Sequence, residues 1–129
     1  MRPISTDKAP AAIGPYNQAI AVPAGGEMIF CSGQIPIDPS NGQLLDGDCA
    51  AQATLVLSNL AAVLDAAGCT FADVVKTTIY LTDMGDFAAV NAVYAEAMDG
   101  HRPARATVAV SGLPKGVAVE IDAIAVRQP

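Results

Sequence analysis

The most regular pattern along the chain is an amphipathic stretch from about residue 48 to residue 67. Its apolar residues recur at helical spacing and would share one face: Ala53, Val56, Leu57, Leu60, Val63, Leu64 and Ala67. Asp48 is suited to be the N-cap of this helix, and Gly68 is suited to end it. The other face is polar, as expected for a helix that lies on a sheet with its back in water.

A second helix is predicted from about Asp86 to Met98, and it should pack beside the first. Its apolar face would hold Phe87, Val90, Tyr94, Ala97 and Met98. Between the two helices, residues 74–81 alternate as a strand does. One side of that strand would carry Val75, Thr77, Ile79 and Leu81, and the more polar side would carry Lys76, Thr78 and Tyr80.

Further strands are predicted on both sides of this helical region. Residues 16–22 and 27–32 read as a β-hairpin joined by the Pro23-Ala-Gly-Gly26 turn, with residues 35–37 continuing in extended form. Two final strands, near 107–111 and 117–126, are joined by the Pro-Lys-Gly turn. The order ββ(β)αβαββ predicts an α+β fold over residues 1–129, one domain with two helices on one face of a mainly antiparallel sheet. The other sheet face would be bare, so we expect subunits to join through it.

Composition supports self-association over membrane insertion. Hydrophobic residues make up 52% of the 129 positions and charged residues only 16%, so polar surface is scarce for an isolated subunit. No apolar run approaches the roughly 18 residues of a membrane span, since residues such as Asn59 and Asp65 interrupt them. The N-terminus lacks the apolar stretch of a signal peptide, and a cytoplasmic location is expected.

Charge narrows the class of ligand. The formal net charge is −6, and no Lys or Arg occurs between Lys8 and Lys76, so the surface should repel nucleic acid. Basic residues reappear at Arg102, Arg105 and Lys115, which favours a small anionic ligand near the C-terminal third.

Most familiar catalytic motifs are missing: there is no P-loop, no GxGxxG after a strand and no GxSxG. The single histidine, His101, is interpreted as a solvated loop residue without a role. The three cysteines have no ligand spacing, so we predict free structural thiols at Cys31, Cys49 and Cys69 and no metal site.

Two charged residues stand out. Glu120 lies in the apolar run from Val117 to Val126, where a carboxylate covered on both faces must be paired, hydrogen-bonded or protonated. Arg105 stands where the chain enters a strand, and its guanidinium could hold a carboxylate through two parallel hydrogen bonds. Taken alone, Glu120 is also compatible with a structural ion pair or an exposed strand position, and Asp122 shares its face and the same alternatives. Arg105 alone is also compatible with a surface cation at a strand edge.

Several long motifs together resemble the RidA (YjgF-type) family of reactive-intermediate deaminases. They are Ala9-Pro-Ala-Ala-Ile-Gly-Pro-Tyr-Asn-Gln-Ala19, Cys31-Ser-Gly-Gln-Ile-Pro36, Val75-Lys-Thr-Thr-Ile-Tyr80, Asp86-Phe-Ala-Ala-Val-Asn91, Pro103-Ala-Arg-Ala106, Leu113-Pro-Lys-Gly116 and Val119-Glu-Ile121. The resemblance spans almost the whole chain. It implies a chorismate-mutase-like subunit, a homotrimer with sites between subunits, and no cofactor.

The implied reaction is hydrolysis of 2-aminoacrylate, 2-iminopropanoate and similar 2-imino acids to 2-keto acids and ammonia. By this resemblance Arg105 binds the substrate carboxylate and Glu120 positions and deprotonates the attacking water. The same resemblance implies that Tyr16, Ser32 and Gly33 line the cleft. Thr107, implied to contribute to substrate binding, stands where many relatives carry Cys, so an oxygen side chain or a backbone amide would hold the water that a thiol neighbours there. Arg102 and the short loop at residues 98–103 also differ from relatives, which bears on substrate range.

Three alternatives remain at this point. One is a pathway-specific deaminase that acts on aminoacrylate from pyrimidine breakdown or on 2-aminomuconate. Another is an endoribonuclease, which the net charge of −6 disfavours. The third is a non-catalytic holdase or binding protein.

Overall fold

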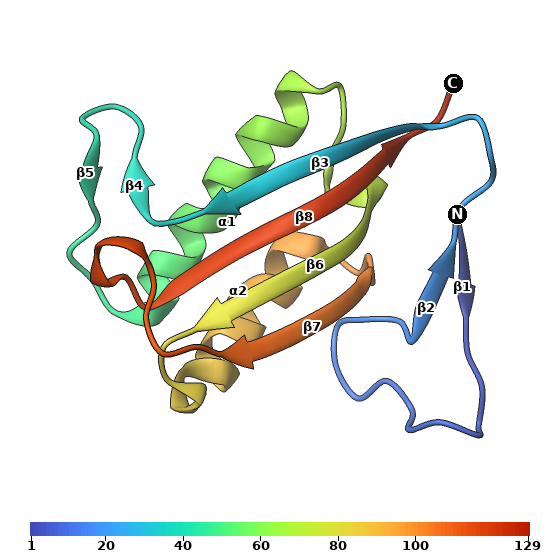
Figure 1. The fold of residues 1–129 in the computed structure, drawn as a ribbon, viewed down its shortest axis with the longest axis horizontal. Coiled ribbons are helices and arrows are strands. Elements are labelled where there is room, and N and C mark those ends of the chain that lie inside the picture. The colour runs from blue at the N-terminus through green and yellow to red at the C-terminus, as the bar shows by residue number, and fades with distance from the viewer.

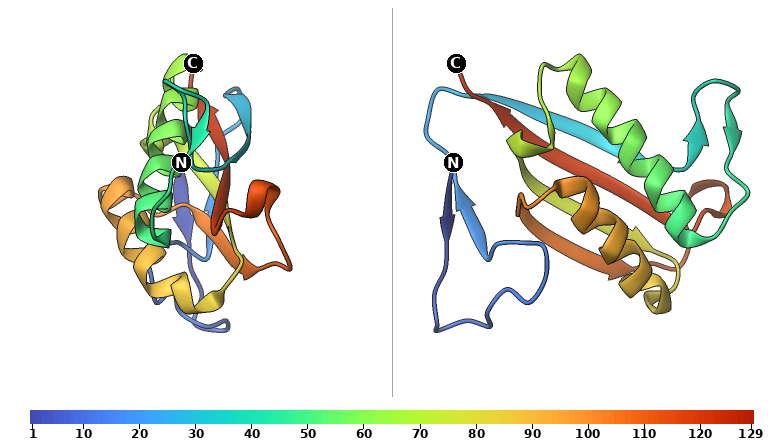
Figure 2. Two further views of the ribbon diagram at one scale, coloured as in Figure 1. Left: turned by 90° about the vertical axis from the view of Figure 1, so that its left-hand side faces the viewer. Right: turned by 180° about the vertical axis from the view of Figure 1, so that it is seen from behind.

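The computed structural model describes residues 1–129 and contains one four-stranded sheet with two helices on one of its faces (Figures 1 and 2). The strands are β1 Arg2–Ile4, β2 Ala19–Ala21, β3 Glu27–Gln34, β4 Ile37–Asp38, β5 Gln43–Leu44, β6 Val74–Leu81, β7 Ala104–Ala109 and β8 Val119–Arg127. The helices are α1 Cys49–Ala66 and α2 Phe87–Met98, with 3-10 turns at Phe71–Asp73, Met84–Asp86 and Pro114–Gly116. The main sheet has the order β3-β8-β6-β7, and the predicted α+β class is confirmed.

Helix α1 begins and ends where the sequence predicts. The side chain of Asp48 accepts a hydrogen bond from the backbone N–H of Ala51 at 2.9 Å, which caps the helix. Gly68 follows the helix with φ +73°, a conformation that glycine adopts without steric cost. By length and hydropathy α1 resembles a membrane span, but five of its apolar residues are buried in the core of this fold. They are Ala53, Val56, Leu57, Leu60 and Leu64.

Strand β6 lies in the middle of the main sheet, between β8 and β7. Thr77, Ile79 and Leu81 are buried beneath the helices, as their alternation predicts. A β-bulge between Val74 and Lys76 shifts the alternation at the start of the strand, so Val74 is buried there and Val75 only partly. The polar side of β6 therefore faces away from the helices.

The two C-terminal strands do not pair with each other. β7 pairs with β6 in parallel, and β8 pairs with the other edge of β6 in antiparallel orientation. Because a parallel neighbour requires a crossover connection, α2 runs back over the sheet between β6 and β7. β7 also begins at Ala104, earlier than the predicted residue 107, and ends at Ala109.

The predicted N-terminal hairpin is wrong. β2 pairs with β1 in a small separate ribbon that stands beside the main sheet, whereas β3 pairs with β8 (Figure 1). A turn signal such as Pro23-Ala-Gly-Gly26 reports only local reversal of the chain. The long apolar strand β8 offers β3 a longer ladder that also buries Cys31, and this nonlocal pairing prevails.

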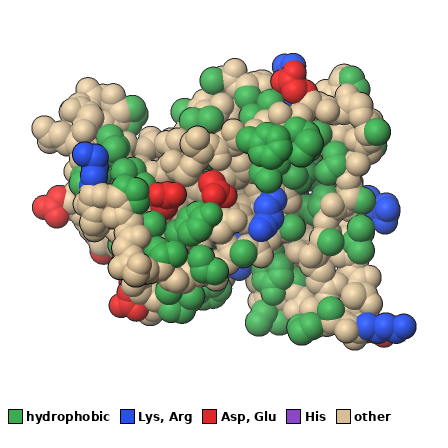
Figure 3. Space-filling model, viewed as in Figure 1, with side chains coloured by type: hydrophobic (Ala, Val, Ile, Leu, Met, Phe, Trp, Pro, Cys, Tyr) green, Lys and Arg blue, Asp and Glu red, His purple; other side chains and the backbone are tan.

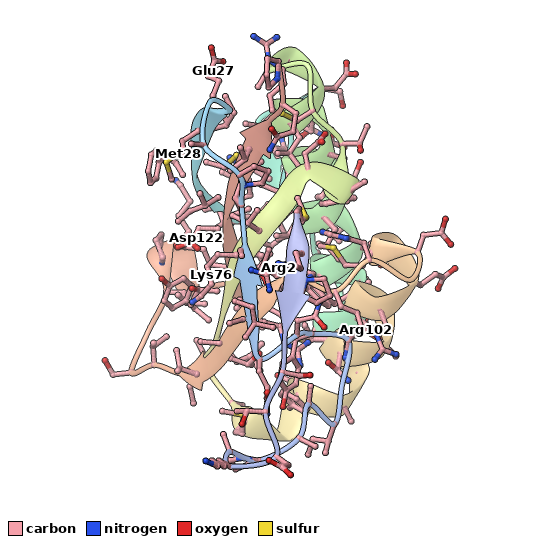
Figure 4. The ribbon with its side chains drawn as sticks, turned by 90° about the vertical axis from the view of Figure 1, so that its right-hand side faces the viewer. Arg2, Glu27, Met28, Lys76, Arg102 and Asp122 are labelled. Carbon is pink, nitrogen blue, oxygen red and sulfur yellow. The ribbon has the colours of Figure 1, made fainter.

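The face of the sheet opposite the helices is open in the single chain. Phe30 is 70% exposed and Met28 is 57% exposed on this side. Figure 4 shows Met28, Lys76 and Asp122 pointing to the open side, and Figure 3 shows green hydrophobic atoms together with charged groups over it. One chain therefore covers only one face of β8. The assembly of subunits through the open face stays a prediction.

The single histidine is not a solvated loop residue. His101 is half-buried, and its Nε2 lies 2.7 Å from the backbone oxygen of Val74. It therefore ties the loop after α2 to the start of β6. The prediction for the cysteines is confirmed, because Cys31, Cys49 and Cys69 are all free and buried.

Candidate active site

Arg105 is held against the helical layer by several neighbours at once. Its strand partner in β6 is Thr77, which is buried under the helices, so the Arg105 side chain leaves the sheet on the helix side. There Nη1 donates a hydrogen bond of 2.6 Å to Oδ1 of Asn91 in α2. Three aromatic rings surround the guanidinium carbon, at 5.2 Å for Tyr16, 5.8 Å for Phe87 and 5.1 Å for Tyr94.

The electrostatic setting leaves this cation available to an anion. The only ion pair in the chain joins Arg127 to Glu27, so no carboxylate neutralises Arg105. Burial among the rings lowers the pKa of the Arg105 guanidinium from its ordinary value, yet an arginine remains charged in proteins. A half-buried, unpaired guanidinium in fixed orientation is suited to grip a planar carboxylate through two hydrogen bonds.

Tyr94, which lies against the Arg105 guanidinium, is itself buried and hydrogen-bonded. Tyr94 and Thr77 are fully buried, and their hydroxyl oxygens lie 2.8 Å apart. Desolvation raises the pKa of Tyr94, so the phenol stays neutral beneath the guanidinium. The ring of Tyr94 therefore forms a fixed platform for the cation.

Thr107 lies two residues beyond Arg105 and on the same side of β7, where it pairs with buried Ile79. Its Oγ1 is buried and has no hydrogen-bond partner. Such an orphan hydroxyl in a folded protein calls for a bound water or ligand group, because an unpaired buried polar atom is costly.

Glu120 belongs to a different neighbourhood, on the open face of the sheet. It pairs with Tyr80 of β6, and Val119 and Ile121 beside it in sequence point into the core. β3 bulges between Cys31 and Gln34, which brings Ser32 and Gly33 next to it. A Cβ atom at Gly33 would overlap Oε2 of Glu120, so only glycine allows this close approach.

A second carboxylate stands near Glu120 on this face. The hydroxyl of Tyr80 donates a 3.0 Å hydrogen bond to Oδ2 of Asp122, and this bond is the main reason that the pKa of Tyr80 is raised. Asp122 is thus engaged with Tyr80, whereas no side-chain partner occupies Glu120 within the chain.

The six residues that the sequence singled out therefore form two groups. Arg105, Tyr16 and Thr107 lie on the helix side of β7, at the edge of the sheet. Ser32, Gly33 and Glu120 lie on the open side, across β6. No single chain brings the two groups together. No cluster of His, Cys, Asp and Glu side chains has the arrangement of a metal site.

Sequence reasoning did not assign a functional role to the residues that hold Arg105. Asn91 was one letter of a family motif, and Phe87 and Tyr94 fitted an ordinary packing face of a helix. The available signal was Asn91 itself, a polar amide one residue after buried Val90 in a largely apolar helix.

Comparison with known sequences shows the family to which this chain belongs. The model described as endoribonuclease L-PSP matches residues 6–127. The chain is 58% identical over 123 residues to Protein DfrA of Myxococcus xanthus, covering 95% of this chain and 93% of that protein. It is 52% identical over 126 residues to the 2-iminobutanoate/2-iminopropanoate deaminase of Mus musculus, covering 98% of this chain and 91% of that protein.

Solved structures agree over nearly the full length. The YjgF gene product of E. coli superimposes with a TM-score of 0.75 at 48% identity, covering 99% of this chain and 100% of that one. E. coli TdcF with bound serine gives a TM-score of 0.75 at 45% identity, again covering 99% of this chain and 100% of that one. The chain therefore belongs to the RidA (YjgF-type) family, which the endoribonuclease L-PSP model describes.

Proposed function

We propose that this protein is an enzyme that hydrolyses 2-imino acids, such as 2-iminopropanoate and 2-iminobutanoate, to 2-keto acids and ammonia. The observation that carries the proposal is Arg105, a half-buried guanidinium without an ionic partner, fixed by Asn91 and three rings. The mouse relative bears the name of this activity at 52% identity. The serine bound to E. coli TdcF has the 2-amino carboxylate framework from which such imines derive.

Arg105 supplies recognition in this proposal. Its guanidinium grips the substrate carboxylate, while the Tyr16 ring covers one side of it and sets the direction of approach. Thr107 Oγ1, which is buried without a partner, donates to the substrate or to a bound water on the same side.

Glu120 supplies the proton transfer. Water adds to the imine carbon, the C=N π electrons move to nitrogen, and Glu120 takes the proton that the water gives up. Both protons of the water end on the nitrogen: Glu120 returns the first, and the second leaves the new hydroxyl as its oxygen forms the C=O bond. The C–N bond breaks in the same step and releases ammonia and the keto acid. Ser32 and Gly33 shape the space beside Glu120, so the attacking water has a defined position. An enamine such as 2-aminoacrylate enters after proton transfer to its terminal carbon.

The two groups of residues require two chains. Since Arg105 and Glu120 leave the sheet on opposite sides, we propose that Arg105 of one subunit meets Glu120 of a neighbour in a homotrimer. The open sheet face, with Phe30 70% exposed and Met28 57% exposed, is the apolar surface that such an assembly would bury.

The test is a coupled assay in which a serine or threonine dehydratase generates the imine and its disappearance is followed with and without the protein. The background is spontaneous hydrolysis, so rates are read above it. Glu120→Gln should lower kcat by roughly 10²- to 10⁴-fold with little change in KM, because it removes the base and keeps size. Arg105→Ala should mainly raise KM. Wild-type rates in both variants, with fold and mass retained, would remove this site from consideration.

A second activity has one observation in its favour, the endoribonuclease description of the matching family model. The formal net charge of −6 and the acidic pair Glu120 and Asp122 on the open face oppose binding of a phosphate chain. RNA cleavage that persists in Glu120→Gln and Arg105→Ala protein would have to come from another site.

A further inference from the structure

The loop that places Tyr16 beside Arg105 is an unusually long connection. Residues 5–18 join β1 to β2, and loops of this length without helix or strand are uncommon in compact domains unless they bind or cover something. No backbone–backbone hydrogen bond ties residues 6–13 to the rest of the protein. Something other than a backbone ladder must therefore hold the loop in place.

One side chain at the base of the loop does so. Gln18 accepts a hydrogen bond from the backbone N–H of Thr6 through Oε1 at 2.7 Å. Its Nε2 faces three backbone oxygens, at 3.1 Å for Thr6, 3.4 Å for Ala9 and 2.6 Å for Pro10. Both ends of a single amide are thus committed to the loop, and they close it on itself.

The neighbouring residue anchors the loop to the sheet. The Nδ2 of Asn17 donates to the backbone oxygen of Arg102 at 2.5 Å, and its backbone N–H donates to the oxygen of Pro103 at 3.0 Å. Asn17 thereby lies along the free edge of β7, beside Ala104. Asn17 fixes where the loop meets the sheet, and Gln18 fixes the path of the loop before that point.

The end of the loop, just before Asn17, lies against Arg105. A Cβ atom at Gly14 would be 3.3 Å from Nη2 of Arg105 and 3.4 Å from the Tyr16 ring, so the backbone of Gly14 limits the space beside the guanidinium. The Tyr16 ring stands 5.2 Å from the guanidinium carbon. A shift of the loop would therefore move the Gly14 backbone and the Tyr16 ring, which lie beside the guanidinium of Arg105.

We propose that Gln18 is a positioning residue for substrate binding, which acts through Gly14 and Tyr16 on Arg105. The expected effect on KM rests on the proposed function. The expected effect on the position of the loop rests on the hydrogen bonds of Gln18 alone. Gln18 touches neither the substrate nor the guanidinium. It sets the pose of the loop, and so the affinity for the carboxylate.

The test begins with two substitutions. Gln18→Ala removes all of the bonds, and Gln18→Glu keeps the oxygen that accepts from Thr6 but places a carboxylate against three carbonyl oxygens. Both should raise KM for the imine roughly tenfold and change kcat by less than about twofold, since loss of hydrogen bonds of this kind amounts to about one factor of ten. A role limited to filling space predicts that Gln18→Glu behaves as wild type.

A double-mutant cycle then asks whether Gln18 acts through Tyr16. In a Tyr16→Ala background, Gln18→Ala should raise KM by less than about twofold more, because the group that it positions is gone. Gln52 provides the matched control: its amide also uses both ends, donating to the oxygen of Gly47 and accepting from the N–H of Ala118, far along the chain from the loop. Any effect of Gln52→Ala should add to that of Tyr16→Ala. Additivity for Gln18 as well would overturn the proposal.

Hydrogen exchange separates this inference from the proposed function. The backbone amide of Thr6, which donates to Gln18, should exchange faster in Gln18→Ala than in wild-type protein, with residues 49–66 of α1 unchanged. Unchanged exchange in the loop would overturn the proposal whatever the activity. If the wild-type protein failed to hydrolyse imines, the proposed function would fall, and faster loop exchange together with weaker pyruvate binding in Gln18→Ala would still support the positioning role.

Discussion

Arg105 and Glu120 leave the same four-stranded sheet on opposite faces. Arg105 pairs with buried Thr77 and reaches Asn91 of α2, whereas Glu120 pairs with Tyr80 on the side without helices. β6 separates their strands. A reaction that needs both side chains at one substrate therefore needs a second copy of the chain, and this relationship makes the shared site directly testable.

Subunit complementation is the first prediction. At substrate concentrations below the wild-type KM, Arg105→Ala and Glu120→Gln proteins should each be strongly impaired. Mixed in equal amounts by unfolding and refolding together, they should regain wild-type kinetics in about one quarter of their sites, the fraction that receives both intact residues by random pairing. Light scattering on wild-type protein should give a trimer mass. A monomer that is still active, or a mixture without regained activity, would contradict the shared site.

Charge alone should not replace Arg105. Arg105→Lys keeps a cation but loses the planar fork, the bond to Asn91 and the stacking among three rings. We expect kcat/KM of Arg105→Lys to fall by roughly a hundredfold, nearly as far as in Arg105→Ala. Steady-state kinetics on folded protein of unchanged mass decides this. A lysine variant within about threefold of wild type would show that the site uses only charge.

Gly33 should be required for the placement of Glu120. A methyl group there would overlap Oε2 of Glu120, so Gly33→Ala must displace the carboxylate or the strand. We expect kcat to fall by roughly tenfold or more with a smaller change in KM. Gly112→Ala is the matched control, since a Cβ atom at Gly112 meets nothing within 4 Å. Equal kinetics in the two variants would refute the close-approach argument.

Alkaline stability should depend on Cys49. Desolvation, followed by the nearby carboxylate of Asp86, raises the pKa of Cys49 from 9.0 to about 11. Below pH 9 the thiol is protonated in both the folded and the unfolded chain, so it contributes no pH dependence. Between pH 9 and about 11 only the unfolded chain loses this proton, so the free energy of unfolding falls as pH rises.

Urea unfolding at pH 8.5 and pH 10.5 measures this effect. The wild-type protein should lose more stability between the two pH values than Cys49→Ala does. Other groups with raised pKa values, including Tyr94 and Cys31, contribute equally to both proteins, so the difference isolates Cys49. Equal losses in the two proteins would show that Cys49 ionises in the folded state as it does in the unfolded chain.

The sequence by itself determined the elements whose signals are local. The helix at residues 49–66 begins after Asp48 and ends before Gly68 because capping and periodicity act within a few residues. The bounds of β6 followed in the same way from its β-branched alternation. Arg105 and Glu120 were chosen as candidates from their surroundings in the chain and from the resemblance to a family.

Only the tertiary structure decided what lies beside what. The Pro/Gly turn before residue 27 indicated a hairpin, yet β3 joined β8, because a long nonlocal ladder buries more apolar surface than a short local one. The same pairing put β6 between Glu120 and Arg105 and turned the two side chains to opposite faces. Asn91 and Gln18 acquired their contacts in the same way, since a hydrogen bond between distant residues leaves no periodic trace along the chain.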